Sequence, residues 1–360
     1  MTIRYGVISD VHKKPEKVKN ALSYLKGIDV DKLLVVGDVG ESAQTITHER
    51  AFTGNILEMI AKSGLTAYVC PGSHETLFGY GNAVNWFANE YPNQIVDVSR
   101  KGKIRNKSHD LVFLPGSDFT CGGEYQLTDE EETGTYVVTS GENIKNDNLD
   151  YAAFNEFKNK NPDKNVLEVT SFFNMNDLKK LVTRPDKTIV VCHVPRKFDL
   201  EGCVDMGHFY SNRKYKRSSI IGADGQWVFE EKGITPGTYN GDDLKLSGIS
   251  CFGLDTSEDE IKSKLDELEG KGFIPELYLE QMGNRGNEKL RKLYEELGIT
   301  KVISGHFHES VHNVHDLNGK PIVEGKFTKE LFWMASHLDE GKFGILNARA
   351  TTVSYENVTL

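Results

Sequence analysis

Short apolar runs alternate with helical patterns over the first third of the chain, and this alternation restricts the possible folds more than any other feature. Residues 3–8, 32–36 and 65–69 are short runs rich in aliphatic and β-branched residues, which is typical of buried strands. Residues 15–26 and 49–62 have apolar residues at helical spacing. Strands separated by helices in this way form a mostly parallel sheet, so the sequence predicts an α/β fold. Further strands are expected at 110–114, 188–192 and 299–304, with a helix at 287–296.

Two long segments interrupt this rhythm. Residues 116–175 are polar and contain an acidic run at 129–132. Residues 197–285 combine glycine-rich loops with a helix expected at 257–268. We interpret both segments as insertions into one core, the second of them cap-like. The core is then expected to comprise residues 1–115, 176–196 and 286–360.

Charge and cysteine usage limit the class and location of the protein. The formal net charge of −10 argues against a protein that coats nucleic acid non-specifically. Five cysteines are widely spaced and include no C-x-x-C pair, which is typical of reduced thiols. No apolar run reaches the ~18–20 residues of a membrane span. The chain opens directly into the strand at 3–8, without a signal-peptide pattern. We therefore expect a cytoplasmic protein with no membrane partner.

Five short polar motifs each follow an expected strand. They are Asp10 with His12, Gly37 with Asp38, Gly72 to Glu75, His193, and Gly305 to His308. In open α/β sheets, ligands bind where loops leave the carboxyl ends of the strands. Carboxylate and imidazole together suit Mn, Fe, Co, Ni or Zn better than Ca. The D-x-H and H-x-H spacings allow both side chains of each pair to leave one face of an extended turn. The motifs therefore predict a metal site.

The ordered set D-x-H, G-D, G-S-H-E, H and G-H-x-H resembles the pattern of the calcineurin-like metallophosphoesterase superfamily. The motifs span residues 10–308, so the resemblance covers the expected core and leaves out the two insertions. It implies a four-layered α/β/β/α sandwich and the hydrolysis of phosphoester bonds. The superfamily includes repair exonucleases with the same motif order.

The resemblance also implies a dinuclear metal centre. One metal would be held by Asp10, His12, Asp38 and His308, and the other by Asp38, Ser73, His193 and His306, with Asp38 bridging. We expect Mn²⁺, with Fe, Ni, Co and Zn as alternatives. Two ions ~3.5–4 Å apart can turn a bridging water into hydroxide and align it for attack on phosphorus. His74 would contact the phosphate or protonate the leaving oxygen as the catalytic residue, and Glu75 would orient His74.

One position departs from the family pattern. The third motif of the family has Asn where this chain has Ser73. A Ser hydroxyl is shorter than an Asn carbonyl and is usually a weaker ligand. We expect a second metal site that is looser, completed by water, or selective for a different metal. The alternative is that Ser73 is a turn residue and no ligand at all.

Basic residues in the second insertion suggest a class of substrate. Tyr210 and Tyr215 are interleaved with a cluster of basic side chains, Arg213, Lys214, Lys216 and Arg217. Such a pattern suits a phosphate backbone with stacked bases, and the alternative is a solvated loop. Arg196, three residues after His193, is a further candidate contact for substrate phosphate. Histidines 48, 109, 208, 312, 315 and 337 match no motif and are expected mostly on the surface or in the core.

These features favour a phosphodiesterase or nuclease, whose partner would be a phosphoester substrate such as a nucleic acid or nucleotide. A small-molecule or nucleotide phosphomonoesterase is the alternative, with the insertions narrowing the site. An alternative of another class is a non-catalytic scaffold that retains its metals. The sequence does not indicate an oligomeric state.

Overall fold

The computed structural model describes residues 2–12, 14–40, 45–99, 101–118, 127, 130–213, 215–217, 227–229, 236–237, 250–252, 257, 259–261, 263, 266–267 and 277–360. The chain forms two compact units. The first comprises Met1–Asp205 and Arg285–Leu360, and the second comprises Met206–Asn284. Within the described ranges, no helix is both long enough and apolar enough to cross a membrane.

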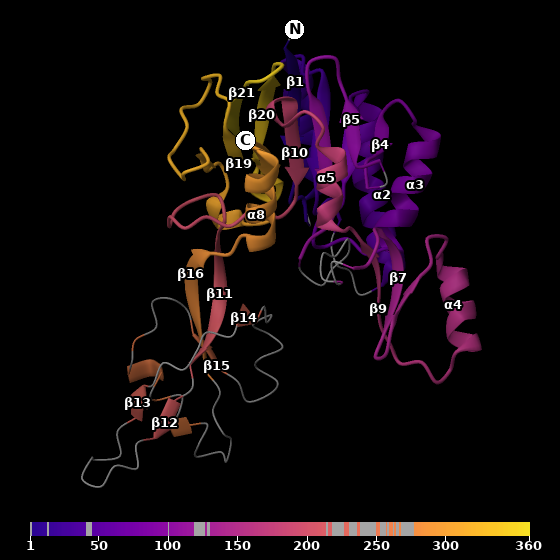
Figure 1. The fold of residues 1–360 in the computed structure, drawn as a ribbon, viewed down its shortest axis with the longest axis vertical. Coiled ribbons are helices and arrows are strands. Elements are labelled where there is room, and N and C mark those ends of the chain that lie inside the picture. Colours follow the sequence, from indigo (N-terminus) through magenta and orange to yellow (C-terminus); the bar gives the residue numbers. More distant parts are fainter. Residues whose placement is uncertain are drawn as a thin grey trace. The chain divides into compact units, whose positions relative to one another are not determined.

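The first unit contains a six-stranded sheet built around the N-terminal strand (Figure 1). Its order is β21 (Val353–Thr359), β20 (Lys342–Ala348), β1 (Ile3–Ile8), β2 (Lys32–Val36), β3 (Thr66–Cys70) and β4 (Ile95–Asp97). The pairs from β1 to β4 are parallel, and β20 and β21 add antiparallel pairs at the other edge. The helices α1 (Pro15–Gly27), α2 (Ile46–Ser63) and α3 (Gly79–Glu90) pack on this sheet through one apolar cluster.

A second six-stranded sheet continues the parallel pattern. Its order is β18 (Val314–His315), β19 (Leu331–Met334), β17 (Lys301–Ser304), β10 (Thr188–Cys192), β6 (Asp110–Leu114) and β5 (Lys103–Arg105). The four central strands are parallel, and the two edge strands are antiparallel to them. The helices α5 (Leu178–Leu181) and α8 (Glu288–Leu297) cover its outer face through a further apolar cluster.

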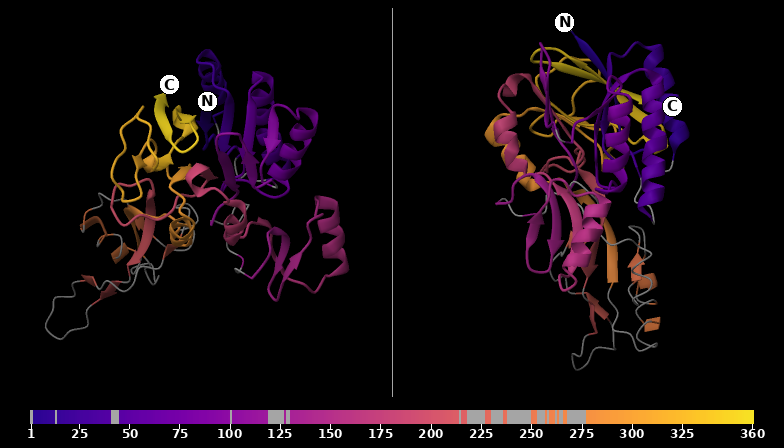
Figure 2. Two further views of the ribbon diagram at one scale, coloured as in Figure 1. Left: turned by 45° about the horizontal axis from the view of Figure 1, so that its top comes forward. Right: turned by 90° about the vertical axis from the view of Figure 1, so that its right-hand side faces the viewer.

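The two sheets face each other across a fully buried interior. Tyr5 and Leu34 of the first sheet belong to the same apolar cluster as Phe113, Ile189 and Trp333 of the second. Because helices cover the outer face of each sheet, the order of layers is helix, sheet, sheet, helix, as Figure 2 shows from two sides. The α/β/β/α fold class expected from the motifs is confirmed.

Capping residues determine where the longer helices begin and end. The hydroxyl of Thr45 accepts the amide hydrogen of His48 at the start of α2, and Gly64 ends that helix with a φ of +81°. The side chain of Asn287 caps α8 in the same way, and Gly298 ends it with a φ of +66°. These signals explain why the expected helices at 49–62 and 287–296 lie close to the observed bounds.

Part of the first expected insertion forms a small sheet of its own. The strands β7 (Gly134–Thr139), β8 (Asn143–Lys145) and β9 (Val166–Phe172) are antiparallel, with β7 in the centre. The helix α4 (Tyr151–Lys160) follows β8. Val137 and Leu149 pack on Phe78, three residues beyond Glu75. This small sheet therefore rests on the loop that carries the third motif. Asp129 of the acidic run lies outside the described residues.

The second unit is a sheet of short and long strands. β11 (Met206–Arg213) pairs antiparallel with β16 (Leu277–Asn284), flanked by β14 (Pro236–Gly237) and β15 (Ser250–Phe252). β12 (Tyr215–Arg217) pairs with β13 (Trp227–Phe229). Of the helix expected at 257–268, the described residues include the capping pair, in which Ser257 and Glu260 hydrogen-bond each other. Lys214 lies outside the described residues.

Candidate metal centre

The five motifs meet at one edge of the paired sheets in the first unit. Asp10 follows β1, Asp38 follows β2 and His74 follows β3, while His193 follows β10 and His306 follows β17. All five strands belong to the parallel parts of the two sheets, so within each sheet their carboxyl ends lie at one edge. Four motif residues adopt left-handed backbone conformations, with φ of 53° at Asp10, 43° at His12, 47° at Asp38 and 83° at His306. Such backbone is unfavourable for residues other than glycine and clusters at functional sites.

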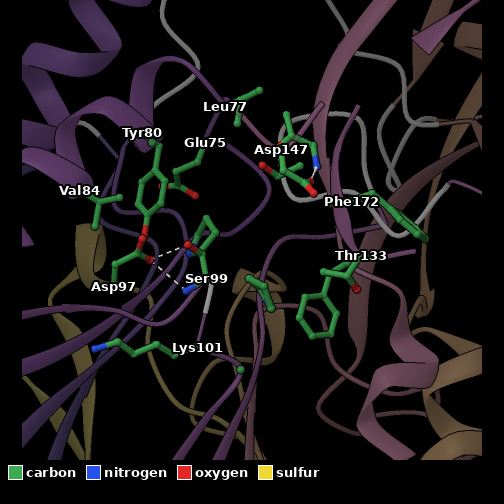
Figure 3. Close-up of a pocket in the computed structure, with 18 of the residues that line it drawn as sticks. Glu75, Leu77, Tyr80, Val84, Asp97, Ser99, Lys101, Thr133, Asp147 and Phe172 are labelled. Carbon is green, nitrogen blue, oxygen red and sulfur yellow. Dashed lines mark hydrogen bonds between the residues drawn. The ribbon is translucent and has the colours of Figure 1, made fainter. Parts of the chain in front are cut away.

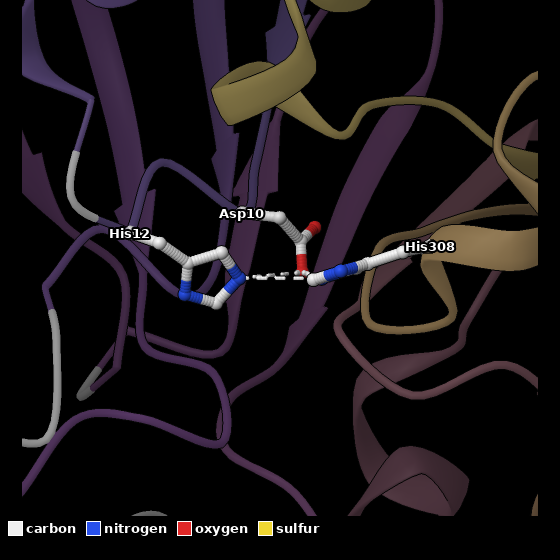
Figure 4. Close-up of side chains that lie close together, drawn as sticks. All are labelled: Asp10, His12 and His308. Atoms are coloured by element: carbon white, nitrogen blue, oxygen red, sulfur yellow. Dashed lines mark hydrogen bonds and ion pairs between the residues drawn. The ribbon is translucent and has the colours of Figure 1, made fainter. Parts of the chain in front are cut away.

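One group of ligand atoms consists of Asp10, His12 and His308 (Figure 4). Nε2 of His308 lies 3.2 Å from Oδ1 of Asp10 and 3.2 Å from Nε2 of His12. The Asp10 carboxylate is fully buried. Burial raises its pKa, but the hydrogen bond from His308 and the charge of His193 outweigh burial and hold the pKa at about 2. Asp10 is therefore ionised and can share a cation with the two imidazoles.

A second group consists of Asp38, His193 and His306. Nε2 of His193 lies 3.1 Å from Oδ2 of Asp38. Nδ1 of His193 donates to the carbonyl oxygen of Val36 at 2.8 Å, which directs Nε2 toward the carboxylate. Burial alone would lower the pKa of His193, but Asp38 raises it to about 10. In the metal-free protein this imidazole is therefore protonated against Asp38, and a divalent cation would replace that proton.

Ser73 points into the second group. Its hydroxyl oxygen lies 3.0 Å from Oδ2 of Asp38, 3.5 Å from Nε2 of His193 and 3.4 Å from Nδ1 of His306. The residue is 5% exposed. The side chain is thus placed where a ligand would be, although whether it binds a metal stays a prediction.

Asp38 joins the two groups. It belongs to the second group and also to a third, with His12 and His74. Oδ1 of Asp38 accepts the backbone amide of His74 at 2.9 Å, and Oδ2 lies 3.9 Å from Nε2 of the same residue. Burial raises the pKa of Asp38, but His193 outweighs it and holds the pKa well below the usual range. A buried carboxylate shared between two sets of imidazoles fits a bridging ligand.

His74 lies at the accessible side of the centre. Its side chain is 40% exposed, whereas that of His193 is fully buried. Its ring meets the ring of His12 edge to face at 4.8 Å between centroids. A partly exposed imidazole beside both ligand groups can reach a substrate that enters from solvent.

Glu75 connects the loop after β2 with the loop after β3 through hydrogen bonds. Its carboxylate accepts backbone amides from Gly72 at 2.6 Å, Gly40 at 2.8 Å and Asp38 at 3.2 Å. The residue is 1% exposed. The sequence had suggested that Glu75 orients His74, and the contacts with Gly40 and Asp38 reveal a further role that was missed.

His337 is a neighbour of the centre that the sequence analysis did not select. Its ring stacks on that of His308, with 3.6 Å between centroids and 28° between planes. Oδ1 of Asp339 lies 2.5 Å from Nε2 of His337, and the backbone amide of Asp339 donates to the carbonyl oxygen of Asp10 at 3.1 Å. His337 follows β19, which is parallel to β17. The apolar run at 331–334 was the signal that would have placed His337 at the same sheet edge.

The other candidate residues lie elsewhere. Arg196 packs its guanidinium between the rings of Phe198 and Phe332, in the apolar cluster outside the second sheet. Arg213 lies on β11, and Lys216 and Arg217 lie on β12 in the second unit. A role for these residues in substrate binding stays a prediction.

A cavity of about 550 Å³ lies beside the third motif (Figure 3). Glu75, Leu77 and Tyr80 line it on one side, and Thr133 and Phe172 line it on the other. The cavity is therefore formed jointly by the core and by the small sheet of the first expected insertion.

A known protein family matches much of the chain. The family model for calcineurin-like phosphoesterases matches residues 3–218, more than half of the chain, and this stretch includes Asp10, Asp38, Ser73 and His193. No curated protein matches the chain. The crystal structure of TT1561 of Thermus thermophilus is similar at 10% identity, with 99% of each chain covered and a TM-score of 0.48. Another crystal structure is similar at 12% identity, with the same coverage and a TM-score of 0.49.

Proposed function

The chain belongs to the calcineurin-like phosphoesterase family, and on that premise we propose that it is a phosphodiesterase or nuclease with a dinuclear metal centre. The family hydrolyses phosphoesters with metal ions, so the general reaction follows from membership. The observation that carries the proposal is that Asp38 belongs to two of the three groups of candidate ligands. A single buried carboxylate in that position can bridge two ions.

The ligand assignment combines these groups with the family pattern. We assign Asp10, His12, Asp38 and His308 to one metal, and Asp38, Ser73, His193 and His306 to the other. The donors are imidazole, carboxylate and hydroxyl, a set that suits Mn²⁺ and also accommodates Fe, Ni, Co or Zn. When bound, the two ions would activate a water and neutralise charge on the phosphoryl oxygens.

The protein's own residues would orient the substrate and move the proton. His74 is the proposed catalytic residue, because its side chain is 40% exposed, compared with 14% for His12 and 0% for His193. It would hydrogen-bond a phosphoryl oxygen or donate a proton to the leaving oxygen. The amide of His74 is held by Asp38 at 2.9 Å, which fixes the position of its backbone relative to the centre.

The choice of a diester rests on the second expected insertion. Arg213, Lys214, Lys216 and Arg217 form a basic cluster with interleaved tyrosines, which suits a polynucleotide backbone. We propose that residues 1–115, 176–196 and 286–360 form the hydrolase core, and that 116–175 and 197–285 shape access to it. Three of the five cysteines, Cys70, Cys192 and Cys203, are buried and form no disulfide within the described residues, which supports a reducing compartment such as the cytoplasm.

Hydrolysis of two chromogenic esters tests the proposal. Metal-stripped protein is assayed with bis-p-nitrophenyl phosphate and p-nitrophenyl phosphate after adding Mn, Ni, Co, Zn or Mg singly. We expect metal-dependent turnover that favours the diester and that is lost in both His74→Ala and Asp38→Ala. A preference for the monoester would replace the diester assignment with a phosphomonoesterase. Metal binding without any turnover would contradict the enzyme assignment and favour a scaffold.

The basic cluster is tested separately. Neutralising Arg213, Lys214, Lys216 and Arg217 together is expected to reduce cleavage of single-stranded nucleic acid, while hydrolysis of the small diester stays nearly unchanged. Equal losses on both substrates would contradict a backbone-binding role and indicate that the segment shapes the active site.

A further inference from the structure

The guanidinium of Arg196 is buried in the first unit with few hydrogen-bond partners. Its side chain is 4% exposed. Nε and Nη1 form no hydrogen bond within the described part of the chain, and Nη2 has one long bond, 3.4 Å to the carbonyl oxygen of Leu317. The carboxylate of Glu295 lies 3.6 Å from Nη1, beyond hydrogen-bond distance. Burial lowers the pKa of Arg196, yet a guanidinium remains charged at neutral pH.

Aromatic rings compensate part of this burial. The guanidinium carbon lies 4.3 Å from the ring centroid of Phe198 and 4.9 Å from that of Phe332. Contacts with ring faces stabilise the charge but leave the N–H donors without acceptors. A buried charge with so few hydrogen-bonding partners is unfavourable, so unsatisfied donors of this kind call for an acceptor.

Arg196 is one of the residues that line a cavity of about 320 Å³. Arg291 lines the same cavity and binds Asp199 through two hydrogen bonds of 2.6 and 2.7 Å. The Asp199 side chain is 73% exposed, so solvent can replace it at low cost. Phe198 and Leu200 form an apolar part of the cavity wall. This volume is at the lower end of the roughly 300–1,000 Å³ of small-molecule sites.

We propose that this cavity binds a small organic molecule through a phosphate or carboxylate group held by Arg196. The two Nη groups of the planar guanidinium form a fork that matches two oxygens of an oxyanion, and Nη1 has no hydrogen bond within the described residues. Asp199 and Glu295 balance the charges of the two arginines. When the oxyanion of the ligand binds Arg196, it displaces the Asp199 carboxylate from Arg291, so the total charge of the site is kept low. Phe198 and Leu200 contact the apolar part of the molecule.

This site is distinct from the metal centre. Although Arg196 is three residues after His193, its ring contacts lie in the apolar cluster between the second sheet and α8. The inference therefore goes beyond phosphoester hydrolysis and does not depend on the proposed function.

Titration calorimetry on the metal-free, full-length protein tests the proposal, with inorganic phosphate and acetate as separate probes. We expect saturable binding of at least one anion, and the tighter of the two identifies the oxyanion group of the natural ligand. Arg196→Met is expected to weaken that binding at least tenfold. Arg196→Lys keeps the positive charge but lacks the paired N–H donors of a guanidinium, and its loss of anion affinity is expected to be smaller than that of Arg196→Met. Binding at equal affinity in wild type and Arg196→Met, or no binding of either anion, would overturn the proposal.

Two further variants separate this site from the metal centre. Asp38→Ala removes the carboxylate shared by the ligand groups and is expected to leave anion affinity unchanged. Loss of binding in Asp38→Ala with none in Arg196→Met would overturn the proposal, because the anion would then occupy the metal centre. If Arg196→Met fails to fold, Arg291→Gln at the cavity wall provides the test, and unchanged affinity in that variant would equally contradict the proposal.

Discussion

Oε2 of Glu75 lies 2.6 Å from the backbone nitrogen of Gly72, three residues earlier in the chain. The same carboxylate accepts amides from Asp38 and Gly40 in the loop after β2. One buried side chain therefore holds the second and third motifs at a fixed separation. Because Asp38 is the carboxylate shared by the ligand groups, the position of the candidate metal bridge depends on Glu75.

Replacing Glu75 with Gln should loosen this connection. The amide nitrogen of Gln cannot accept a hydrogen bond, so at least one buried amide loses its partner, at a cost of ~1–3 kcal/mol in unfolding free energy. We expect metal affinity and kcat/KM to fall by ~10–100-fold, as for other groups that orient metal ligands. Metal titration and urea unfolding measure the two effects. Glu156→Gln on the exposed face of α4 is the control and should behave as wild type. Unchanged metal affinity in Glu75→Gln would show that the loops hold without it.

Ser73→Asn restores the residue type expected from the family pattern. The hydroxyl of Ser73 lies 3.0 Å from Oδ2 of Asp38, and an Asn carbonyl would reach further into the second group. Since even groups behind the ligands change metal affinity by ~10–100-fold, we expect the weaker of two Mn²⁺ sites to tighten by at least about tenfold. Calorimetric titration with Mn²⁺ measures both sites. Ser73→Ala should weaken the same site, and identical isotherms for all three proteins would identify Ser73 as a turn residue only.

Gly72 leaves no room for a side chain next to the shared carboxylate. A Cβ atom there would lie 2.6 Å from the backbone nitrogen of Asp38 and 2.9 Å from Cδ2 of His193. Backbone cannot move aside cheaply, so Gly72→Ala is expected to displace Asp38 and abolish metal-dependent turnover. Gly81→Ala on α3 is the matched control, because nothing lies within 4 Å of its Cβ position. It should keep full activity and gain ~0.5–1 kcal/mol in helix stability. Wild-type turnover in Gly72→Ala would contradict the packing argument.

The sequence predicted the parts of this centre that depend on local order. Asp10, Asp38 and His193 each follow a recognisable strand, and the parallel arrangement of those strands brings them together. The α/β class with its parallel strands follows from the same alternation of strands and helices, whereas the four layers were implied by the family resemblance. Such inferences need only the period of the apolar pattern and the direction of the strands.

Contacts that depend on the path of a loop could not be predicted from the sequence. The carboxylate of Glu75 accepts the amide of Gly40, 35 residues earlier in the chain, and nothing in the order of residues indicates that Glu75 points toward that loop. His337 stacks on His308 because β19 is the neighbour of β17; the apolar run at 331–334 marks the strand, but the order of residues does not show which strand it pairs with. The sequence suggested Arg196 as a candidate contact for substrate phosphate, and its packing against Phe198 in the apolar cluster outside the second sheet could not be predicted from the order of residues.

A buried histidine away from the metal centre gives the protein a pH-dependent stability. His109 lies between the sheets, where its Nε2 is 2.8 Å from the hydroxyl of Tyr5 and its Nδ1 is 2.9 Å from the hydroxyl of Ser108. Burial lowers the pKa of His109 to about 4, and the nearby charges of Lys32 and Arg184 act in the same direction. Asp110 raises the pKa but does not offset burial.

His109→Gln should remove this dependence. The native state binds fewer protons than the unfolded state between pH 6.5 and about 4, so wild-type stability falls as the pH is lowered through that window. The shift of the His109 pKa from 6.5 to about 4 corresponds to a loss of about 3 kcal/mol in the free energy of unfolding. This loss is complete near pH 4 and absent above pH 7. Gln can still hydrogen-bond Tyr5 but does not titrate. Urea unfolding of metal-free wild type and variant at pH 7.5 and 4.5 measures the difference, in which the carboxylates and other histidines common to both proteins cancel. If the free energy of unfolding changed equally with pH in the two proteins, His109 would already be protonated in the folded state.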